Sequence, residues 1–236
     1  MKYKSLTCAI AMSVGVLTAP LALADLNEGL IAHYPFNGNA EDVSGNDNHG
    51  TVTGATIEEG VVHIGESQSN DSFVTFGNTI DQFGTNDFSV AFWFNTQEQA
   101  SLFDLAGDRK VGSHGNFFDI RMLGNGGAVR PEVDQDSSGT NINYFDSTTI
   151  GLNDGNWHQV ATVRMGNSLT LYIDGQLDKT ASANGIANIS NNNDFRLGRS
   201  YAGFPNAVVQ YDNLRIYNRA LSECEIQLLF TLVKMN

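Results

Sequence analysis

The residues best suited to chemistry lie in one polar segment near the start of the chain, between Tyr34 and Gly50. Turn-forming residues crowd this segment, and many of them carry side-chain oxygens: Asn37, Asn39, Glu41, Asp42, Asn46, Asp47 and Asn48. A calcium ion requires hard oxygen donors of this kind on a tightly turning backbone. The same composition also fits a solvated loop whose Asn and Asp side chains bond their own main chain. Two interpretations therefore stand side by side, a calcium site and a simple polar loop.

A second group of candidate residues is the run Glu132-Val133-Asp134-Gln135-Asp136. Alternate side chains of an extended strand share one face and lie about 6.5–7 Å apart. Retaining glycosidases use two carboxyl groups about 5–5.5 Å apart, so leaning side chains bring this set within reach. Glu132, Asp134 and Asp136 are thus the candidate catalytic residues, with Glu132 and Asp136 as the pair that a polysaccharide-cleaving enzyme would use. The run leads into Ser137-Ser138-Gly139, which is equally typical of an acidic strand end.

The remaining chemistry in the sequence is sparse. No His-Glu-x-x-His, Gly-x-Ser-x-Gly or phosphate-loop motif is present, and the five histidines are scattered. Tyr201 and Phe204 lie in a segment expected to be a loop, where they are candidate platforms for binding sugar rings. Trp93 and Trp157 each sit within a strand pattern, so we expect them in the core rather than at a ligand.

Short β-strands are the elements that must position these residues. The strand from 88 to 95 places Phe88, Val90, Phe92 and Phe94 on one face and Ser89, Ala91 and Trp93 on the other. Asp174-Gly175 predicts a type I′ turn. Ser222-x-x-Glu225 is a capping box that opens a short C-terminal helix. Further strands are expected at 61–64, 73–76, 101–106, 117–123, 128–134, 142–145, 157–164, 168–174, 195–197 and 208–217. This pattern predicts an all-β sandwich or jelly roll with one helix.

The chain begins with a targeting pattern. Lys2 and Lys4 precede an apolar segment, and Ala22-Leu23-Ala24 supplies a cleavage site, which predicts a signal peptide at residues 1–24 and a single domain at 25–236. The protein is therefore expected to be secreted, in the extracellular space or the periplasm, with no membrane span in the mature chain. A formal net charge of −13 argues against nucleic acid as a partner.

Five stretches of the chain resemble the laminin-G-like, concanavalin-A-like jelly rolls of bacterial secreted proteins, and they follow one another in the same order as in that family. The opening Asp42-x-Ser44-Gly45-Asn46-x-Asn48-x-Gly50 and the closing Arg215-Ile216-Tyr217-Asn218-Arg219-Ala220-Leu221 are similar to the ends of that family. Phe88 to Trp93, Trp157 to Ala161 and Leu171 to Gly175 match its middle. The resemblance implies an antiparallel β-sandwich whose termini are adjacent.

The resemblance also implies a structural calcium ion near the N-terminal loop. Asp42, Asn46 and Asn48 would supply oxygens from the loop, and Asp212 a carboxylate from the last strand. Glu132 to Asp136 is similar to the Glu-x-Asp-x-Glu signature of jelly-roll β-glucanases, with Asp136 in place of the final glutamate.

These patterns favour a secreted, non-catalytic, calcium-stabilised module that binds a carbohydrate or a cell-surface partner, either a glycan or an extracellular protein. Two alternatives remain open. One is a polysaccharide-cleaving glycoside hydrolase that uses Glu132, Asp134 and Asp136. The other is a structural adhesion module without a small ligand.

Overall fold

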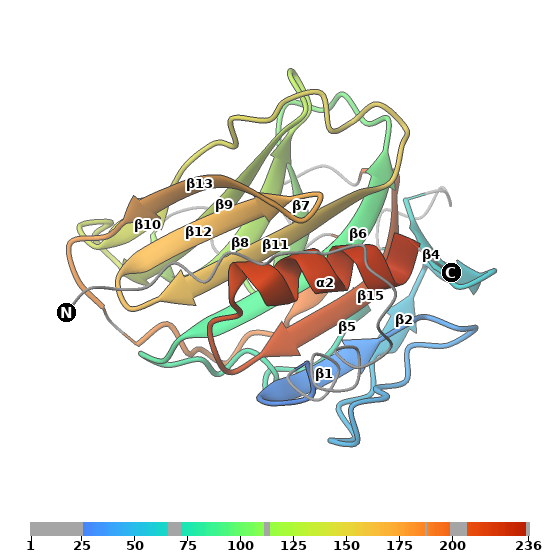
Figure 1. Ribbon diagram of the computed structural model, residues 1–236, viewed down its shortest axis with the longest axis horizontal. Helices are drawn as coiled ribbons and strands as arrows, with labels where there is room; N and C mark the ends of the chain where they lie inside the picture. The colour runs from blue at the N-terminus through green and yellow to red at the C-terminus, as the bar shows by residue number, and fades with distance from the viewer. Residues whose placement is uncertain (1–25, 66–71, 111–113, 187, 199–206, 235–236) are drawn as a thin grey trace, which may run out of the picture.

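The computed structural model of this chain describes residues 26–65, 72–110, 114–186, 188–198 and 207–234. Two antiparallel sheets face each other, and one helix lies on the outer side of the first sheet (Figure 1). The predicted signal peptide, Tyr201 and Phe204 lie outside the described residues. The sandwich with a C-terminal helix, as predicted from the sequence, is confirmed.

The first sheet, sheet A, is built around β6 and carries the helix. Its strands in spatial order are β13 (Gln176–Ser182), β12 (Ser168–Ile173), β11 (His158–Met165), β6 (Phe88–Thr96), β15 (Val209–Tyr217), β4 (Val61–Ile64) and β3 (Thr56–Glu58), and β1 (Leu30–Tyr34) also pairs with β15. The pairing of β1 with β15 joins the two ends of the domain, as expected.

The second sheet, sheet B, holds the acidic run singled out above. Its strands in spatial order are β10 (Ile142–Tyr144), β9 (Ala128–Asp136), β8 (Gly115–Leu123), β7 (Phe103–Gly107), β14 (Arg196–Gly198), β5 (Phe73–Thr75) and β2 (Thr51–Thr53). On β9, Val129 and Val133 belong to the core between the sheets. Glu132, Asp134 and Asp136 alternate with Val133 and therefore face the other side.

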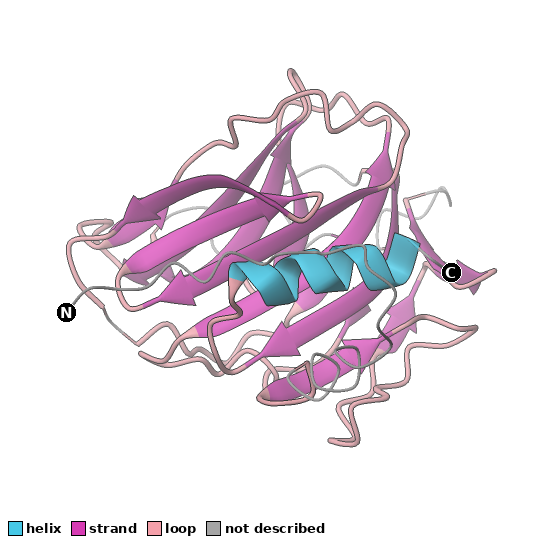
Figure 2. Cartoon of the chain, viewed as in Figure 1, coloured by secondary structure: helices cyan, strands magenta, loops and turns pink. Residues whose placement is uncertain are grey.

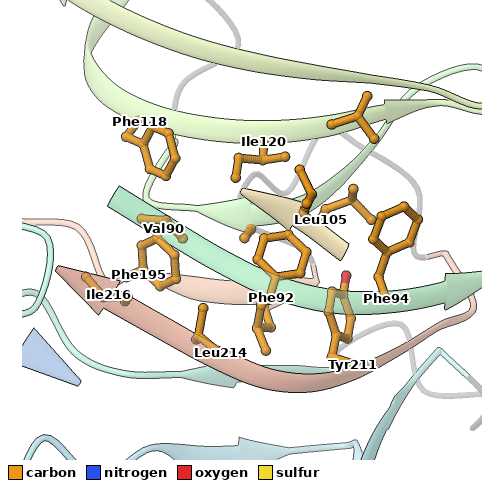
Figure 3. Close-up of a cluster of buried hydrophobic side chains, with 14 of the residues drawn as sticks. Val90, Phe92, Phe94, Leu105, Phe118, Ile120, Phe195, Tyr211, Leu214 and Ile216 are labelled. Atoms are coloured by element: carbon orange, nitrogen blue, oxygen red, sulfur yellow. The ribbon is translucent and has the colours of Figure 1, made fainter. Parts of the chain in front are cut away.

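The core fills the space between the two sheets. Phe92 and Phe94 of β6 and Tyr211 of β15 point toward Phe118 and other apolar side chains of sheet B (Figure 3). All four of these side chains are buried, at 0–1 % exposure. Burying one such side chain stabilises a fold by about 1.5–3 kcal/mol. The alternation along β6 therefore predicted correctly that Phe92 and Phe94 share one face, and this face lies in the sandwich core.

Part of the other face of sheet A is covered by α2 (Glu223–Lys234), as Figure 2 shows. Ile226 and Leu229 of the helix are buried against Ala91, Ala161 and Val163 of the sheet. Trp93 stacks on Phe230, with ring centroids 5.3 Å apart. The helix begins at the predicted capping box, where Ser222 N donates to Glu225 Oε2 (2.8 Å) and Glu225 N to Ser222 Oγ (3.4 Å). Among helices of the described ranges, none combines the length and apolar character needed to cross a bilayer.

Trp157 departs from expectation. It was expected in the core, but its side chain is 36 % exposed, whereas Trp93 is 7 % exposed. Trp157 precedes β11 at the rim of sheet A, where it is not covered to the same extent. The predicted type I′ turn is confirmed, because Asp174 and Gly175 both have positive φ, 49° and 74°.

Candidate functional site

The polar segment near the N-terminus runs back along β1 and closes the free edge of that strand. Val43 N donates to His33 O at 2.9 Å, and His33 N donates to Asp42 Oδ1 at 2.9 Å. Gly45, with φ of 91°, permits the tight turn that follows. The loop thus supplies the hydrogen bonds that a neighbouring strand would otherwise give to β1.

The carboxylate of Asp42 is the acceptor around which this loop is arranged. Besides His33 N, it accepts hydrogen bonds from Ser44 N (2.9 Å), Ser44 Oγ (2.8 Å) and Asn48 N (3.1 Å). Burial alone raises the pKa of Asp42, but the hydrogen bonds from His33, Ser44 and Asn48 outweigh burial and lower that pKa. Asp42 therefore holds the loop as an ionised carboxylate at neutral pH.

Asn46 and Asn48 meet at the main-chain carbonyl of Ile31. The Nδ2 atoms of both residues lie 3.0 Å from Ile31 O, and Asn46 Nδ2 is also 2.9 Å from Leu30 O. Ser44 Oγ donates to the same carbonyl of Ile31 at 3.2 Å. The structure therefore brings together three residues predicted from the sequence, Asp42, Asn46 and Asn48, and adds Ser44.

The donor set around Ile31 consists of oxygen-bearing groups but contains no carboxylate, and among the described residues no three His, Cys, Asp or Glu side chains gather in a way that could hold a metal ion. The set offers two main-chain carbonyls, one hydroxyl and two amide side chains, which are oxygen-bearing groups that calcium accepts. In the arrangement described, both amides turn nitrogen toward the carbonyls. Binding of a cation requires the amides of Asn46 and Asn48 to rotate so that each Oδ1 takes the place of Nδ2.

The contact between the last strand and the loop region runs through Asn213. A β-bulge separates Asp212 from Arg215, and Asn213 within it has φ of 54°. Asn213 Oδ1 lies 3.1 Å from Nε2 of His33, the residue whose main chain binds Asp42. Burial, followed by the charge of Arg215, lowers the pKa of His33 to about 4, so His33 is neutral at neutral pH.

Asp212, the predicted fourth ligand, pairs with Trp93 on the face of sheet A that carries α2. Burial raises the pKa of Asp212 to about 6, opposed by the N–H of Asn213. Within the described ranges no hydrogen bond joins Asp212 to Asp42, Asn46 or Asn48.

Glu132, the first of the acidic residues on β9, belongs to a buried cluster of charges. It is 5 % exposed and forms ion pairs with the guanidinium groups of Arg121 and Arg109, the latter at 3.5 Å. Asp119 on β8 lies opposite Glu132 and 3.3 Å from Arg121 Nε. Burial, reinforced by the charge of Asp104, raises the pKa of Asp119 well above its usual value. Two arginines thus hold Glu132 in place.

Asp134 and Asp136 have different partners. Asp134 is fully buried, and its Oδ2 lies 2.8 Å from His114 Nδ1 and 3.2 Å from Gly115 N. Asp136 accepts hydrogen bonds from Ser138, Thr140 and Asn141, including Ser138 Oγ at 2.6 Å and Asn141 N at 2.7 Å. The Ser138 hydroxyl contributes most to lowering the pKa of Asp136. A general acid needs a raised pKa, so Asp136 is poorly matched to that role.

A groove that the sequence did not predict lies at the C-terminal end of β6. It has a volume of about 500 Å³ and is lined by Asn95, Thr96, Gln97, Glu98, Gln99, Gly155, Val208 and Gln210. The signal available in the sequence was the amide-rich stretch from Asn95 to Gln99 at the end of an apolar strand. Exposed Trp157 lies two residues beyond Gly155.

Comparison with known proteins gives a family and a set of structural relatives. The family model Laminin_G_3, described as the concanavalin A-like lectin/glucanases superfamily, matches residues 68–227. Paraclostridial mosquitocidal protein 1 of Paraclostridium bifermentans is 26% identical over 209 residues, which cover 80% of this chain and 16% of that protein.

Solved structures with the same fold include toxin binding domains. The binding domain of Paraclostridial mosquitocidal protein 1 superposes with a TM-score of 0.72 at 20% identity, over 88% of this chain and 53% of that one. The binding domain of botulinum neurotoxin DC in complex with rat synaptotagmin II gives 0.70 at 17% identity, over 88% and 52%. This chain thus spans about half of each solved relative, and the likeness establishes a common fold.

Proposed function

This chain belongs to the concanavalin A-like lectin/glucanases superfamily, and from that premise we propose that it is a secreted, non-catalytic binding module. It recognises a carbohydrate or a cell-surface partner, and calcium stabilises it. The observation that carries the proposal is the state of the β9 carboxylates. Glu132 is neutralised by two arginines, and Asp136 accepts the hydrogen bonds of the turn that follows it.

The relatives support binding rather than hydrolysis. The matching structures include binding domains of toxins, one of them in complex with rat synaptotagmin II and another in complex with SialylT. Function does not follow from fold alone, and this chain covers only part of each relative. The proposal for this protein therefore rests first on its own β9 carboxylates, and the relatives indicate which classes of partner to test.

The test combines a binding screen with an activity assay on the same preparation. We expect the secreted protein to bind a member of a glycan array or an extracellular receptor panel, and to release no reducing sugar from a polysaccharide panel. The double variant Glu132→Gln, Asp136→Asn should retain binding, with a thermal melt as the check of folding. Hydrolysis by the wild type that the double variant loses by orders of magnitude would refute the proposal.

Calcium stabilisation is tested separately by melting the protein in millimolar calcium and in a chelator. An ion that binds the folded state stabilises it by about 2.7 kcal/mol at a hundredfold excess over Kd. For a domain of roughly 200 residues, this raises Tm by about 5–10 °C. Asn48→Ala should abolish the gain, and Asp47→Ala, whose side chain is 91 % exposed, is the matched control. Equal melting of the wild type in both buffers would contradict the calcium proposal.

Secretion is tested by N-terminal sequencing of exported material. The pattern Ala22-Leu23-Ala24 leads us to expect a mature chain that begins at Asp25. Exported protein that retains Met1 would contradict a cleaved signal peptide.

A further inference from the structure

Four residues from adjacent segments of sheet A form a row on its outer face. Gln210 of β15 pairs with Asn95 of β6 on one side and with His63 of β4 on the other. Trp157 directly precedes His158, which pairs with Phe94, so Trp157 lies beside Asn95. Neighbouring strands are about 4.8 Å apart, so the row is about 15 Å long. In Figure 2, β6 and β11 meet at the corner of sheet A above the right-hand end of α2.

The row faces away from the sandwich core. Phe94, Tyr211 and Val62, which neighbour the row residues along their strands, are fully buried in the core. Alternation along a strand therefore turns Asn95, Gln210 and His63 to the opposite side. Asn95, Gln210 and His63 are partly exposed, and Trp157 is 36 % exposed.

The groove of about 500 Å³ continues this row past the end of β6. Four of its lining residues are carboxamides, namely Asn95, Gln97, Gln99 and Gln210. Each carboxamide offers both a hydrogen-bond donor and an acceptor. Gln210 Nε2 lies 3.3 Å from His63 Nδ1 and Asn95 Nδ2 donates to Gly155 O, whereas no hydrogen bond to another described residue is found for the carboxamide of Gln97 or for Oδ1 of Asn95. The groove therefore presents unused donors and acceptors beside an exposed indole ring.

Hydrogen bonds join the segments that surround these groups. Asn95 Nδ2 donates to Gly155 O at 2.8 Å, and Gly155 N donates to Thr96 O at 3.0 Å. Thr96 Oγ1 donates to Val208 O at 2.6 Å, which joins the end of β6 to the segment before β15. A rigid frame lowers the entropic cost of ordering the site when a ligand binds.

The chemistry of the row and groove selects a neutral sugar. An indole face accepts the apolar side of a pyranose ring, while carboxamides exchange hydrogen bonds with its hydroxyls. The lining contains one charged residue, Glu98, and neither lysine nor arginine. A carboxylate in the groove and a chain charge of −13 oppose anionic ligands.

We propose that this row and groove bind a neutral oligosaccharide, with Trp157 as the platform for one ring. Asn95, Gln97 and Gln210 bond the hydroxyls of the adjoining sugars. The inference rests on the binding function proposed above, and it places the ligand on the outer face of sheet A, across the sandwich from the acidic run of β9.

The experiment compares binding of neutral and sialylated oligosaccharides by the wild type and by single variants. Trp157→Ala should weaken binding of the neutral ligand by at least about tenfold, as expected for an aromatic anchor. Asn95→Ala and Gln210→Ala should each weaken it several-fold. Tyr144→Ala is the matched control, because Tyr144 is an aromatic side chain, 51 % exposed, on β10 of the other sheet. Thermal melts check that every variant is folded.

Tryptophan fluorescence gives a second readout. The chain has two tryptophans, Trp93 buried and Trp157 exposed. Ligand binding should shift the emission of the wild type to shorter wavelength, and Trp157→Phe should bind measurably without that shift.

The possible failures are distinguishable. If Trp157→Ala and Gln210→Ala bind a glycan as tightly as the wild type, the site is wrong while the binding function stands. If the wild type binds sialylated but no neutral glycans, the ligand class is wrong. If the wild type binds no glycan and no receptor, this inference and the proposed function both fail.

Discussion

Replacing Asp42 by asparagine tests whether its carboxylate holds the N-terminal loop independently of any metal. Asparagine keeps Oδ1, which accepts from His33 N and Ser44 N, but places an N–H₂ group where Oδ2 receives Ser44 Oγ and Asn48 N. The serine hydroxyl can turn to accept, whereas Asn48 N loses its acceptor. Losing a hydrogen bond to a charged group costs about 1.5–3 kcal/mol, and an unpaired donor adds about 1 kcal/mol or more.

The expected total is about 2–4 kcal/mol, because water near the loop surface replaces part of the lost interaction. A domain of this size loses about 2–4 °C of Tm per kcal/mol, so Asp42→Asn should melt about 5–15 °C below the wild type. The assay is a thermal melt at pH 7 in a chelator. Asp47→Asn is the control, because the Asp47 side chain is 91 % exposed and its contact with His49 spans 4.0 Å.

The pH dependence of this effect has a definite sign. The pKa of Asp42 is lowered in the fold, so its contribution to stability is present above the unfolded pKa near 3.9 and is lost as the pH falls below it. The gap in Tm between wild type and Asp42→Asn should therefore narrow progressively as the pH falls below about 4, through the lowered pKa of the folded state. If Asp42→Asn and Asp47→Asn have the same Tm at pH 7 in a chelator, the Asp42 carboxylate does not hold the loop.

Three further substitutions test polar groups elsewhere in the fold. Burial raises the pKa of Asp81 to about 7, so its contribution to stability is lost as the pH rises through 7. The Tm of the wild type should therefore fall between pH 5 and 8, and the Tm of Asp81→Asn should fall less over the same range. The hydrogen bond to Asp174 raises the pKa of His158; Asp174→Asn should lower that pKa in an NMR titration, and an unchanged pKa would contradict the assignment. Arg164 donates to the carbonyls of Gly84 (2.9 Å) and Asn86 (3.0 Å), so Arg164→Met should cost about 2–4 kcal/mol in denaturant unfolding, whereas a cost below about 1 kcal/mol would be inconsistent with these bonds.

The sequence predicted strands where burial imposes a pattern and missed them where it does not. β6 is buried on both faces, and its alternation placed both sets of side chains correctly. The edge strand β13 and the short strands β2 and β3 have largely exposed side chains, so their residues carry no apolar period. Such strands form because main-chain groups pair with a neighbouring strand, which composition does not reveal.

The sequence predicted which loop residues of the candidate site come together, but not which residue of the last strand contacts them. Asp42, Asn46 and Asn48 come together because local turn chemistry gathers them. The β-bulge after Asp212 turns Asn213 toward His33 instead, and a shift of one residue in register has no signal in the sequence. Trp157 was misplaced because a strand pattern shows which side chains share a face, but not how far a helix on that face extends.

The pairing of β1 with β15 also determines how the domain responds to tension. Leu30 at the start of β1 lies opposite Tyr217 at the end of β15, and beyond them Asn218 N donates to Gly29 O and Arg219 Nε to Glu28 O. The segment after Arg219 continues into α2, which packs on sheet A, so a pull on residues before Glu28 and after Arg219 loads these two bonds once α2 has detached. The ladder then opens one pair at a time toward Tyr34 and Leu214, in the manner of a zipper. Strands loaded in this way share little of the force, so the mechanical resistance of the domain is set by a few hydrogen bonds at a time rather than by the whole sheet.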